Sequence, residues 1–301
     1  MIVFQIVVSV PSRKRRGAAL TRTLPELDHD GLLTPVVGEW GEEKYRLIRS
    51  YAEMFARATR KTWHVRVYLD LFAGPGRARL EDSGRIVPGS PLLALEATPP
   101  FDDCIFCELD TTRLDALERR VRVAYPDRDV TYVLGDANAC VDRVLAAIPA
   151  ANRSRKVLGF CVLDPFGMSS LHFSTVRALS VRYMDFLVLV PSGMDAGRFW
   201  EKYESPKDTT VADFLGLPDW RAGWTDPKAR RDGLGHFVLE RFAEQMETLR
   251  YGRGPTKLVR ATDNRRPLYH LAFFSRHALG LRLARGAVEY AQEQRSFAFE
   301  D

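Results

Sequence analysis

The spacing of apolar and polar residues changes along the chain in a way that distinguishes helices from strands. Over residues 42–59, apolar side chains recur every three or four positions with charges between them, which predicts an amphipathic helix. Short β-rich apolar runs then alternate with further helical patterns. The predicted strands are residues 65–72, 104–109, 130–134, 157–163 and 185–190, and the predicted helices between them are 91–97, 111–124, 139–148 and 173–179.

This alternation predicts an α/β fold with a doubly wound, mostly parallel sheet, because helices link parallel strands through right-handed crossovers. The run at residues 157–163 is almost entirely apolar, as expected for the centre of such a sheet. Two later apolar runs, 257–261 and 267–275, predict the last strands, and residues 279–291 predict a terminal helix. We therefore expect a Rossmann-like sheet of seven strands, with ligands bound beyond the carboxyl ends of the strands.

The same patterns divide the chain into four segments. Residues 1–30 are expected to form a disordered tail, or to reflect an upstream start codon; their apolar stretch precedes a basic run, the reverse of a secretory signal. Residues 31–194 predict the Rossmann core. Residues 195–253 break the alternation and predict a helical insertion between strands five and six. Residues 254–301 are expected to complete the core.

Composition and charge restrict the class of protein only loosely. No apolar run in the 301 residues reaches the roughly 20 positions that a membrane span needs, so no membrane partner is expected. The net charge of +5 permits contact with nucleic-acid phosphates without requiring it. Cys104 and Cys107 form a C-x-x-C on a predicted strand, where side chains three residues apart point to opposite faces. We expect buried thiols of a cytoplasmic protein rather than metal ligands.

The clearest candidate site is the loop after the first predicted strand. Asp70, Phe72, Gly74 and Gly76 form a D-x-F-x-G-x-G pattern, whose glycines let the backbone approach a ligand closely. A dinucleotide fingerprint needs a third glycine where Arg79 stands, and the Gly-Lys-Ser/Thr of a P-loop is missing. The pattern resembles motif I of S-adenosylmethionine (SAM) methyltransferases, in which this loop faces the methionine moiety. A tight turn without a ligand is the alternative.

Polar residues also end the second and third predicted strands. Glu108 is placed to hydrogen-bond both ribose hydroxyls of a nucleoside, with a plain surface carboxylate as the alternative. Asp136 and Asn138 follow the third strand, where methyltransferases use an aspartate to receive the adenine amino group. Asn138 is equally typical of a simple turn. Glu108, Asp136 and Asn138 thus join the loop as predicted cofactor-binding residues.

The fourth strand leads into Asp164, Pro165 and Phe166, followed by a glycine. Proline ends a buried strand, so a structural turn is one interpretation. The string also resembles the D-P-P-Y/F motif IV of amino-group methyltransferases without its second proline, and the D-P-F-G of tRNA guanine-N2 methyltransferases. In such sites a carboxylate or carbonyl accepts a hydrogen bond from the target amine, while the aromatic ring stacks on the base. These three residues are the predicted catalytic set, and no metal-ligand motif accompanies them.

The order of several short elements resembles one family, the three-Cys-motif partner proteins (TcmP) of bacteria. The elements lie between residue 32 and the C-terminal helix, and are Trp40 with Lys44, residues 68–76, Gly89-Ser90-Pro91, residues 135–138, residues 163–167 and Phe274-Ser275-Arg276. The resemblance implies a class I methyltransferase-like fold. It also implies a neighbouring protein that carries the three-cysteine motif and is similar to radical-SAM enzymes. It supplies no substrate.

Two hypotheses of function follow. The first is a SAM-dependent methyltransferase that modifies an amine on a base of DNA or RNA and works with the three-Cys-motif protein. The second is a non-catalytic scaffold or specificity subunit for that partner, which the missing second proline of motif IV leaves open. Metal-dependent and serine hydrolysis are disfavoured because their motifs do not occur in the sequence.

Overall fold

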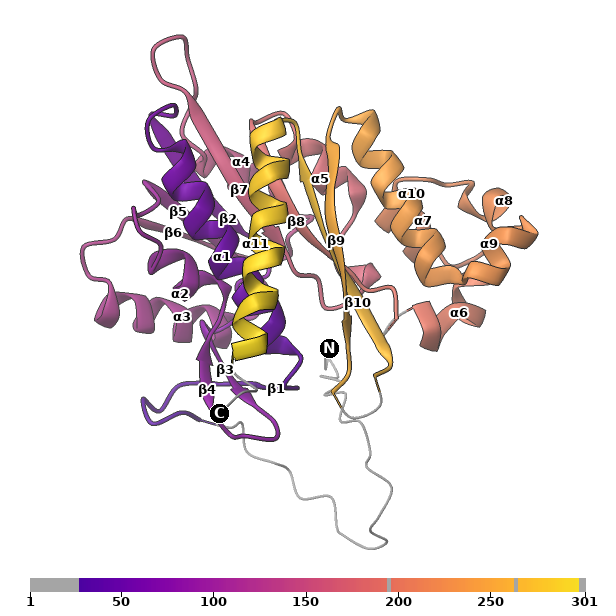
Figure 1. Cartoon of the computed structure of the whole chain (residues 1–301), viewed down its shortest axis with the longest axis horizontal. Coiled ribbons are helices and arrows are strands. Elements are labelled where there is room, and N and C mark those ends of the chain that lie inside the picture. The colour runs from indigo at the N-terminus through magenta and orange to yellow at the C-terminus, as the bar shows by residue number, and fades with distance from the viewer. Residues whose placement is uncertain (1–26, 194–195, 263–264, 298–301) are drawn as a thin grey trace, which may run out of the picture.

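The fold is built on a seven-stranded, mostly parallel β-sheet (Figure 1). The computed structural model describes residues 27–193, 196–262 and 265–297, so most of the predicted N-terminal tail lies outside the described residues. The strand order is β6-β5-β2-β7-β8-β10-β9. The strands are β2 (Val65–Asp70), β5 (Asp103–Glu108), β6 (Val130–Leu134), β7 (Val157–Leu163), β8 (Met184–Val190), β9 (Gly252–Arg260) and β10 (Pro267–Ser275).

Strand direction confirms the predicted doubly wound fold. Strands β6, β5, β2, β7 and β8 are parallel, whereas β10 runs antiparallel to both β8 and β9. Strands β2 and β8 are buried along their whole length, as central parallel strands must be. Strand β9 lies at the edge and begins at Gly252 rather than at residue 257, because its first residues are half-exposed and lack an apolar run.

Helices cover both faces of the sheet, and each face has its own hydrophobic cluster. Cys104 lies in one cluster and Cys107 in the other, which confirms that the C-x-x-C thiols point to opposite faces. The first face carries α1 (Gly41–Thr59), α2 (Ser90–Leu95), α3 (Thr111–Ala124) and α11 (Ala278–Phe297). The second carries α4 (Val141–Ala147) and α5 (Phe173–Leu179). No helix among the described residues is long and apolar enough to cross a membrane.

The segment between β8 and β9 is helical, as predicted, and it extends the second hydrophobic cluster. Its helices are α6 (Ala196–Glu204), α7 (Thr210–Leu215), α8 (Trp220–Trp224), α9 (Pro227–Asp232) and α10 (Leu234–Thr248). The ring of Phe242 lies 5.5 Å from that of Phe173 and 5.9 Å from that of Phe274. The insertion therefore packs against the sheet and α5 as part of the core, beside β9 and β10 in Figure 1.

A small second sheet was not predicted from the sequence. It consists of β1 (Val36–Val37), β3 (Arg77–Leu80) and β4 (Ile86–Pro88), in the order β1-β3-β4. These strands are two to four residues long, and arginines occupy two positions of β3. Such short, charged runs lack the periodicity on which the prediction depended. The sheet lies directly after the loop that ends at Gly76.

The boundary of the predicted tail also differs from the structure. Residues 27–30 were assigned to the tail, but Asp28 is buried and Leu27 bridges to Leu33. Charged side chains attach this segment to the core, as described below. The folded part thus begins at least as early as residue 27.

Candidate functional site

The predicted acidic residues lie at one edge of the sheet. Asp70 and Glu108 are the last residues of β2 and β5, Asp164 directly follows β7, and Asp136 closely follows β6. In the sheet these strands are neighbours, in the order β6-β5-β2-β7. Because the strands are parallel, all four carboxylates follow carboxyl ends at the same edge.

The loop after β2 is fastened to the strands on both sides. Its amides donate to the carbonyls of Val162 on β7 and Cys107 on β5. Gly74 and Gly76 have φ of 63° and 84°, a left-handed conformation that favours glycine. A Cβ on Gly76 would lie 2.8 Å from Leu117, whereas a Cβ on Gly74 would meet no atom within 4 Å. Gly76 thus serves packing, and Gly74 is the point where a ligand can approach the backbone.

Asp70 is fully buried at the end of the central strand. Its Oδ1 accepts a hydrogen bond from the Phe72 amide at 3.1 Å, and the Tyr68 hydroxyl donates to Oδ2 at 3.4 Å. Burial raises the pKa of Asp70 to about 7, although hydrogen bonds from Ser90 and the Phe72 amide act in the opposite direction. The negative charge of Asp164 raises this pKa further. Asp70 therefore changes charge near neutral pH.

Glu108 joins the end of β5 to the glycine loop. Its Oε2 accepts from the Gly74 amide at 2.8 Å, and its Oε1 accepts from the Asp110 amide at 3.0 Å. The Asp110 side chain in turn accepts from the Arg113 amide and caps α3. Each Glu108 oxygen accepts one of these bonds and keeps a further lone pair, which suits a pair of ligand hydroxyls.

Asp136 and Asn138 have different surroundings. Asp136 Oδ1 accepts from the amides of Asn138 and Ala139, which shapes the turn after β6. The Asn138 side chain donates to the Ser170 carbonyl and accepts from the His172 amide and the Thr175 hydroxyl; these bonds hold the segment that enters α5. The amide group of Asn138 thus makes hydrogen bonds within the fold, and its contact with a cofactor stays a prediction.

Asp164 has a partner that the sequence analysis did not include in the site. Lys44, in the first turns of α1, donates to Asp164 Oδ2 as a close ion pair. Burial disfavours the charged ammonium, but the charge and hydrogen bond of Asp164, together with Tyr45 and Tyr269, outweigh the effect of burial and raise the pKa of Lys44. Lys44 appeared only within the family resemblance, and a contact across 120 residues leaves no local signal.

Exposed apolar side chains accompany the carboxylates. Phe166 is 79% exposed, while Pro165 beside it is buried. Leu109, next to Glu108, is 67% exposed, and Leu134 at the end of β6 is 41% exposed. Large exposed apolar groups at a polar edge are typical of ligand-binding surfaces. The edge therefore combines hydrogen-bond acceptors, an open glycine backbone and apolar surface. These are the features that a nucleoside with a charged tail requires of a binding site.

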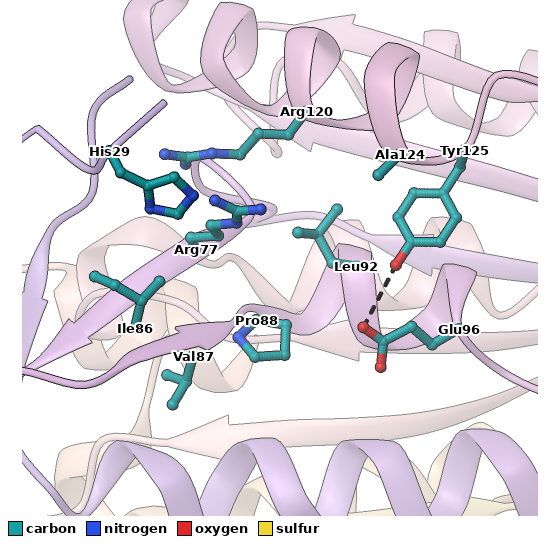
Figure 2. Close-up of a pocket in the computed structure, with 10 residues that line it drawn as sticks. All are labelled: His29, Arg77, Ile86, Val87, Pro88, Leu92, Glu96, Arg120, Ala124 and Tyr125. Atoms are coloured by element: carbon teal, nitrogen blue, oxygen red, sulfur yellow. Dashed lines mark hydrogen bonds between the residues drawn. The ribbon is translucent and has the colours of Figure 1, made fainter. Parts of the chain in front are cut away.

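A cavity of about 330 Å³ lies among the small sheet, α2 and α3, next to the residues that support the glycine loop from behind (Figure 2). It is lined by His29, Arg77, Ile86, Val87, Pro88, Leu92, Glu96, Arg120, Ala124 and Tyr125, none of which is a predicted site residue. Its charged groups already have partners within the protein: Arg77 contacts Asp28, and Glu96 contacts Arg49. We therefore do not assign this cavity as the functional site.

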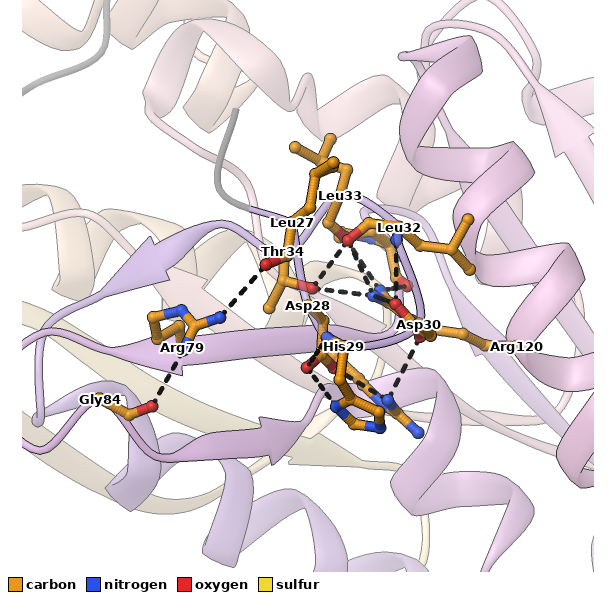
Figure 3. Close-up of polar contacts among 12 residues, drawn as sticks. Leu27, Asp28, His29, Asp30, Leu32, Leu33, Thr34, Arg79, Gly84 and Arg120 are labelled. Atoms are coloured by element: carbon orange, nitrogen blue, oxygen red, sulfur yellow. Dashed lines mark hydrogen bonds and ion pairs between the residues drawn. The ribbon is translucent and has the colours of Figure 1, made fainter. Parts of the chain in front are cut away.

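Arg120 connects the N-terminal segment to the back of the glycine loop (Figure 3). It pairs with Asp30 at 2.8 Å, and it donates to the Thr34 hydroxyl and to the Pro75 carbonyl. Its further bonds go to the carbonyls of Leu32 and Leu33. Because the Arg120 side chain is almost completely buried, one guanidinium holds residues 30–34 and the loop in a fixed relation.

Comparisons with known proteins assign no family to this chain. No family model and no curated protein matches the chain. Among solved structures, LPL1258 from Legionella pneumophila is similar with a TM-score of 0.47 and 12% identity, over 81% of this chain and 90% of that one. A second similar structure is M. jannaschii TYW2 in complex with AdoMet, with a TM-score of 0.35 and 12% identity, over 79% of this chain and 77% of that one.

A third similar structure is the magnesium protoporphyrin IX methyltransferase ChlM from Synechocystis PCC 6803 with bound SAH. Its TM-score is 0.39 at 9% identity, over 78% of this chain and 84% of that one. Likenesses at this level concern the fold alone. The fold assignment itself depends on the strand order and direction described above.

The burial of Asp70 predicts a particular dependence of stability on pH. Its folded-state pKa of about 7 lies above the ordinary value of 3.8, so its favourable contribution is lost as pH rises from about 4 through 7. Asp70→Asn should therefore become more stable than the wild type by about 2–4 kcal/mol as pH rises through this window. Urea unfolding at pH 4.5, 6 and 8 measures the difference, and a difference independent of pH would contradict the assignment.

The buried guanidinium of Arg120 predicts a large loss of stability on its removal. Arg120→Met leaves the Asp30 carboxylate and several carbonyls without their donor, so the free energy of unfolding should fall by about 3 kcal/mol. Arg119→Met is the matched control on the same helix, because Arg119 is exposed and, among the described residues, its ion pair is with Asp115 alone; we expect a change below about 1 kcal/mol. Equal losses in the two variants would show that the Arg120 contacts contribute little.

Proposed function

We propose that this protein is a SAM-dependent methyltransferase that modifies an amine on a nucleic-acid base, and that it works with a three-Cys-motif, radical-SAM-like partner. The observation that supports it most strongly is the placement of Asp70, Glu108, Asp136 and Asp164 after four neighbouring strands of a Rossmann-like sheet. Ligands of such sheets bind at this edge. The resemblance to the TcmP family supports the proposal of a three-Cys-motif partner.

The cofactor would lie along β2, β5 and β6. The loop around Gly74 is open to the methionine moiety, and Glu108 offers an acceptor to the ribose hydroxyls. Asp136 is available to the adenine amino group, with the exposed Leu109 and Leu134 beside the purine ring. When bound, SAM supplies a methyl group on a sulfonium, which is already a good leaving group. The residues of the protein therefore act mainly by positioning.

The methyl acceptor would lie at β7. The Asp164 carboxylate can accept a hydrogen bond from the amine N–H and so direct the nitrogen lone pair toward the methyl carbon. With SAM bound, this nitrogen would form the new bond to the methyl carbon while the carbon–sulfur bond would break with its electron pair going to sulfur, and the nitrogen would then lose a proton to solvent. Phe166 offers an exposed ring on which a base can stack. The net charge of +5 favours a polyanionic substrate.

The ion pair between Lys44 and Asp164 also supports a second candidate function. It ties the motif IV carboxylate into the fold, as expected if that residue has only a structural role. The protein would then be a non-catalytic scaffold or specificity subunit for the three-Cys-motif protein. Calorimetry with SAM separates the two candidates, because only the first requires the cofactor.

The titration of Asp70 predicts that cofactor affinity depends on pH. SAM carries positive charge, so it should bind better when Asp70 is ionised, and a pKa of about 7 gives up to about a tenfold gain between pH 6 and 8. Calorimetry over this range measures the gain. Asp70→Asn should bind more weakly at pH 8 and lose the dependence. If the wild type binds SAM equally at both pH values, Asp70 does not contact the charge of the cofactor.

The exposure of Phe166 gives a test of the acceptor site that does not disturb folding. Phe166→Ala removes a side chain that is 79% exposed, so stability should change by less than about 0.5 kcal/mol. Transfer of labelled methyl groups from SAM to random-sequence single-stranded RNA or DNA should fall at least about tenfold, in line with the loss of one base stack. Val123→Ala, at an 84% exposed position on α3, is the control and should retain full transfer. Equal transfer by both variants would favour the scaffold.

A further inference from the structure

Lys44 lies where the cofactor half and the acceptor half of the proposed site meet. Its side chain is only 12% exposed and pairs with Asp164, whose side chain is 19% exposed. Its positive charge also acts on Asp70, at the end of the neighbouring strand β2. One ammonium group thus forms an ion pair with Asp164 and interacts electrostatically with Asp70, at the ends of adjacent strands.

The two carboxylate oxygens of Asp164 differ in their hydrogen bonding. Lys44 takes Oδ2, and among the residues that the structure describes none donates a hydrogen bond to Oδ1. A carboxylate has lone pairs on both oxygens, so Oδ1 keeps its capacity to accept. Because Asp164 retains some exposure, Oδ1 is the oxygen that an amine can reach.

A buried hydroxyl beside this pair lacks a partner. Tyr269 on β10 is 1% exposed, and its hydroxyl makes no hydrogen bond within the described part of the chain. Burial raises its pKa, and the charges of Lys44 and Asp164 both act on it. A buried donor left unpaired costs about 1–3 kcal/mol. The Tyr269 hydroxyl is thus an unpaired donor that interacts electrostatically with the ion pair, and its hydrogen bond is available to a polar group of a ligand.

Lys44 affects the charge of Asp70 as well as the position of Asp164. Two carboxylates at adjacent strand ends repel each other, and each disfavours the ionised form of the other. The titratable groups that act on Asp70 or are acted on by it are Lys44 and Tyr45 on α1, Tyr68 on β2, Cys107 on β5, and Cys161 and Asp164 around β7. Lys44 is the cation in this set.

We propose that Lys44 is a positioning residue for methyl transfer: it holds Oδ2 of Asp164, presents Oδ1 to the amine of the acceptor, and allows Asp70 and Asp164 to carry negative charge side by side. The Tyr269 hydroxyl donates to a hydrogen-bond acceptor adjacent to that amine. The inference depends on the proposed function. It narrows the acceptor to a group with an N–H donor next to a lone pair, such as the edge of a nucleobase, rather than an alkyl amine.

The experiment measures the affinity for SAM, in the absence of a methyl acceptor, by calorimetry between pH 5.5 and 9. In the wild type the affinity should rise with a midpoint near 7, set by Asp70. Lys44→Met should move this midpoint upward, because the charge that favours ionised Asp70 is gone. Lys44→Arg should restore it. Lys257→Met is the matched control: Lys257 pairs with Glu43, next to Lys44 on α1, and that pair is buried to the same degree.

Each outcome decides a separate question. A Lys44→Met midpoint equal to that of the wild type, or an equal shift in Lys257→Met, overturns the role of Lys44 and leaves the proposed function intact. If the wild type does not bind SAM at any pH, the proposed function fails and the inference with it.

Methyl transfer to random-sequence single-stranded RNA and DNA adds a second readout, in which Lys44→Met should lower kcat at least about 100-fold and Lys44→Arg should recover most of it.

Tyr269→Phe tests the orphan hydroxyl without removing any hydrogen bond of the protein. Stability should stay equal to that of the wild type or rise, since a buried unpaired donor is deleted. Transfer to the same RNA and DNA should fall at least about tenfold, mainly through a higher KM for the nucleic acid. A loss of stability with unchanged transfer would show that the hydroxyl is paired within the protein, and would overturn its assignment to the acceptor.

Discussion

The burial of Asp70 at the end of the central strand is the constraint on which the site depends. Burying an ionised carboxylate away from water costs free energy unless the surrounding groups compensate its desolvation. Here hydrogen bonds from Ser90, from the Phe72 amide in the loop and from the Tyr68 hydroxyl on β2, with the charge of Lys44 on α1, compensate part of that cost. The loop geometry, the strand and the docking of α1 are therefore energetically linked through one side chain.

The glycine loop is held from three directions. The backbone of β5 and β7 fixes its two sides, Glu108 fixes Gly74, and Arg120 fixes Pro75 from behind together with residues 30–34. These contacts organise the loop before any ligand arrives, so binding need not spend free energy on ordering it. The small sheet that follows Gly76 belongs to the same support, because Gly89 at its far end donates to the Gly76 carbonyl.

Sequence patterns predicted most of the large sheet because its strands are buried on both faces and give continuous apolar runs. Strands β6 and β7 and helices α3 and α5 have the predicted bounds, whereas the start of β9 and the small sheet were missed where charged residues interrupt short strands. The residues of the candidate site likewise fall into those with local contacts, which the sequence predicts, and those with long-range contacts, which it does not. Asp70, Glu108 and Asp136 make local backbone contacts that adjacent motifs encode. The polar bonds of Asn138 and the pair of Lys44 span 32 to 120 residues and could not be predicted from neighbouring positions.

This difference follows from how the two halves of the site are built. The cofactor half consists of strand ends and the turns that leave them, so its shape is determined wherever the parallel sheet forms. The acceptor half needs α1 to bring Lys44 to Asp164, and β10 to bring Tyr269 beside them. Its geometry is therefore determined by how a helix and an antiparallel strand pack against the sheet. Changes in that packing alter the acceptor half first, while Glu108 and Gly74 keep their hydrogen bond within the parallel core.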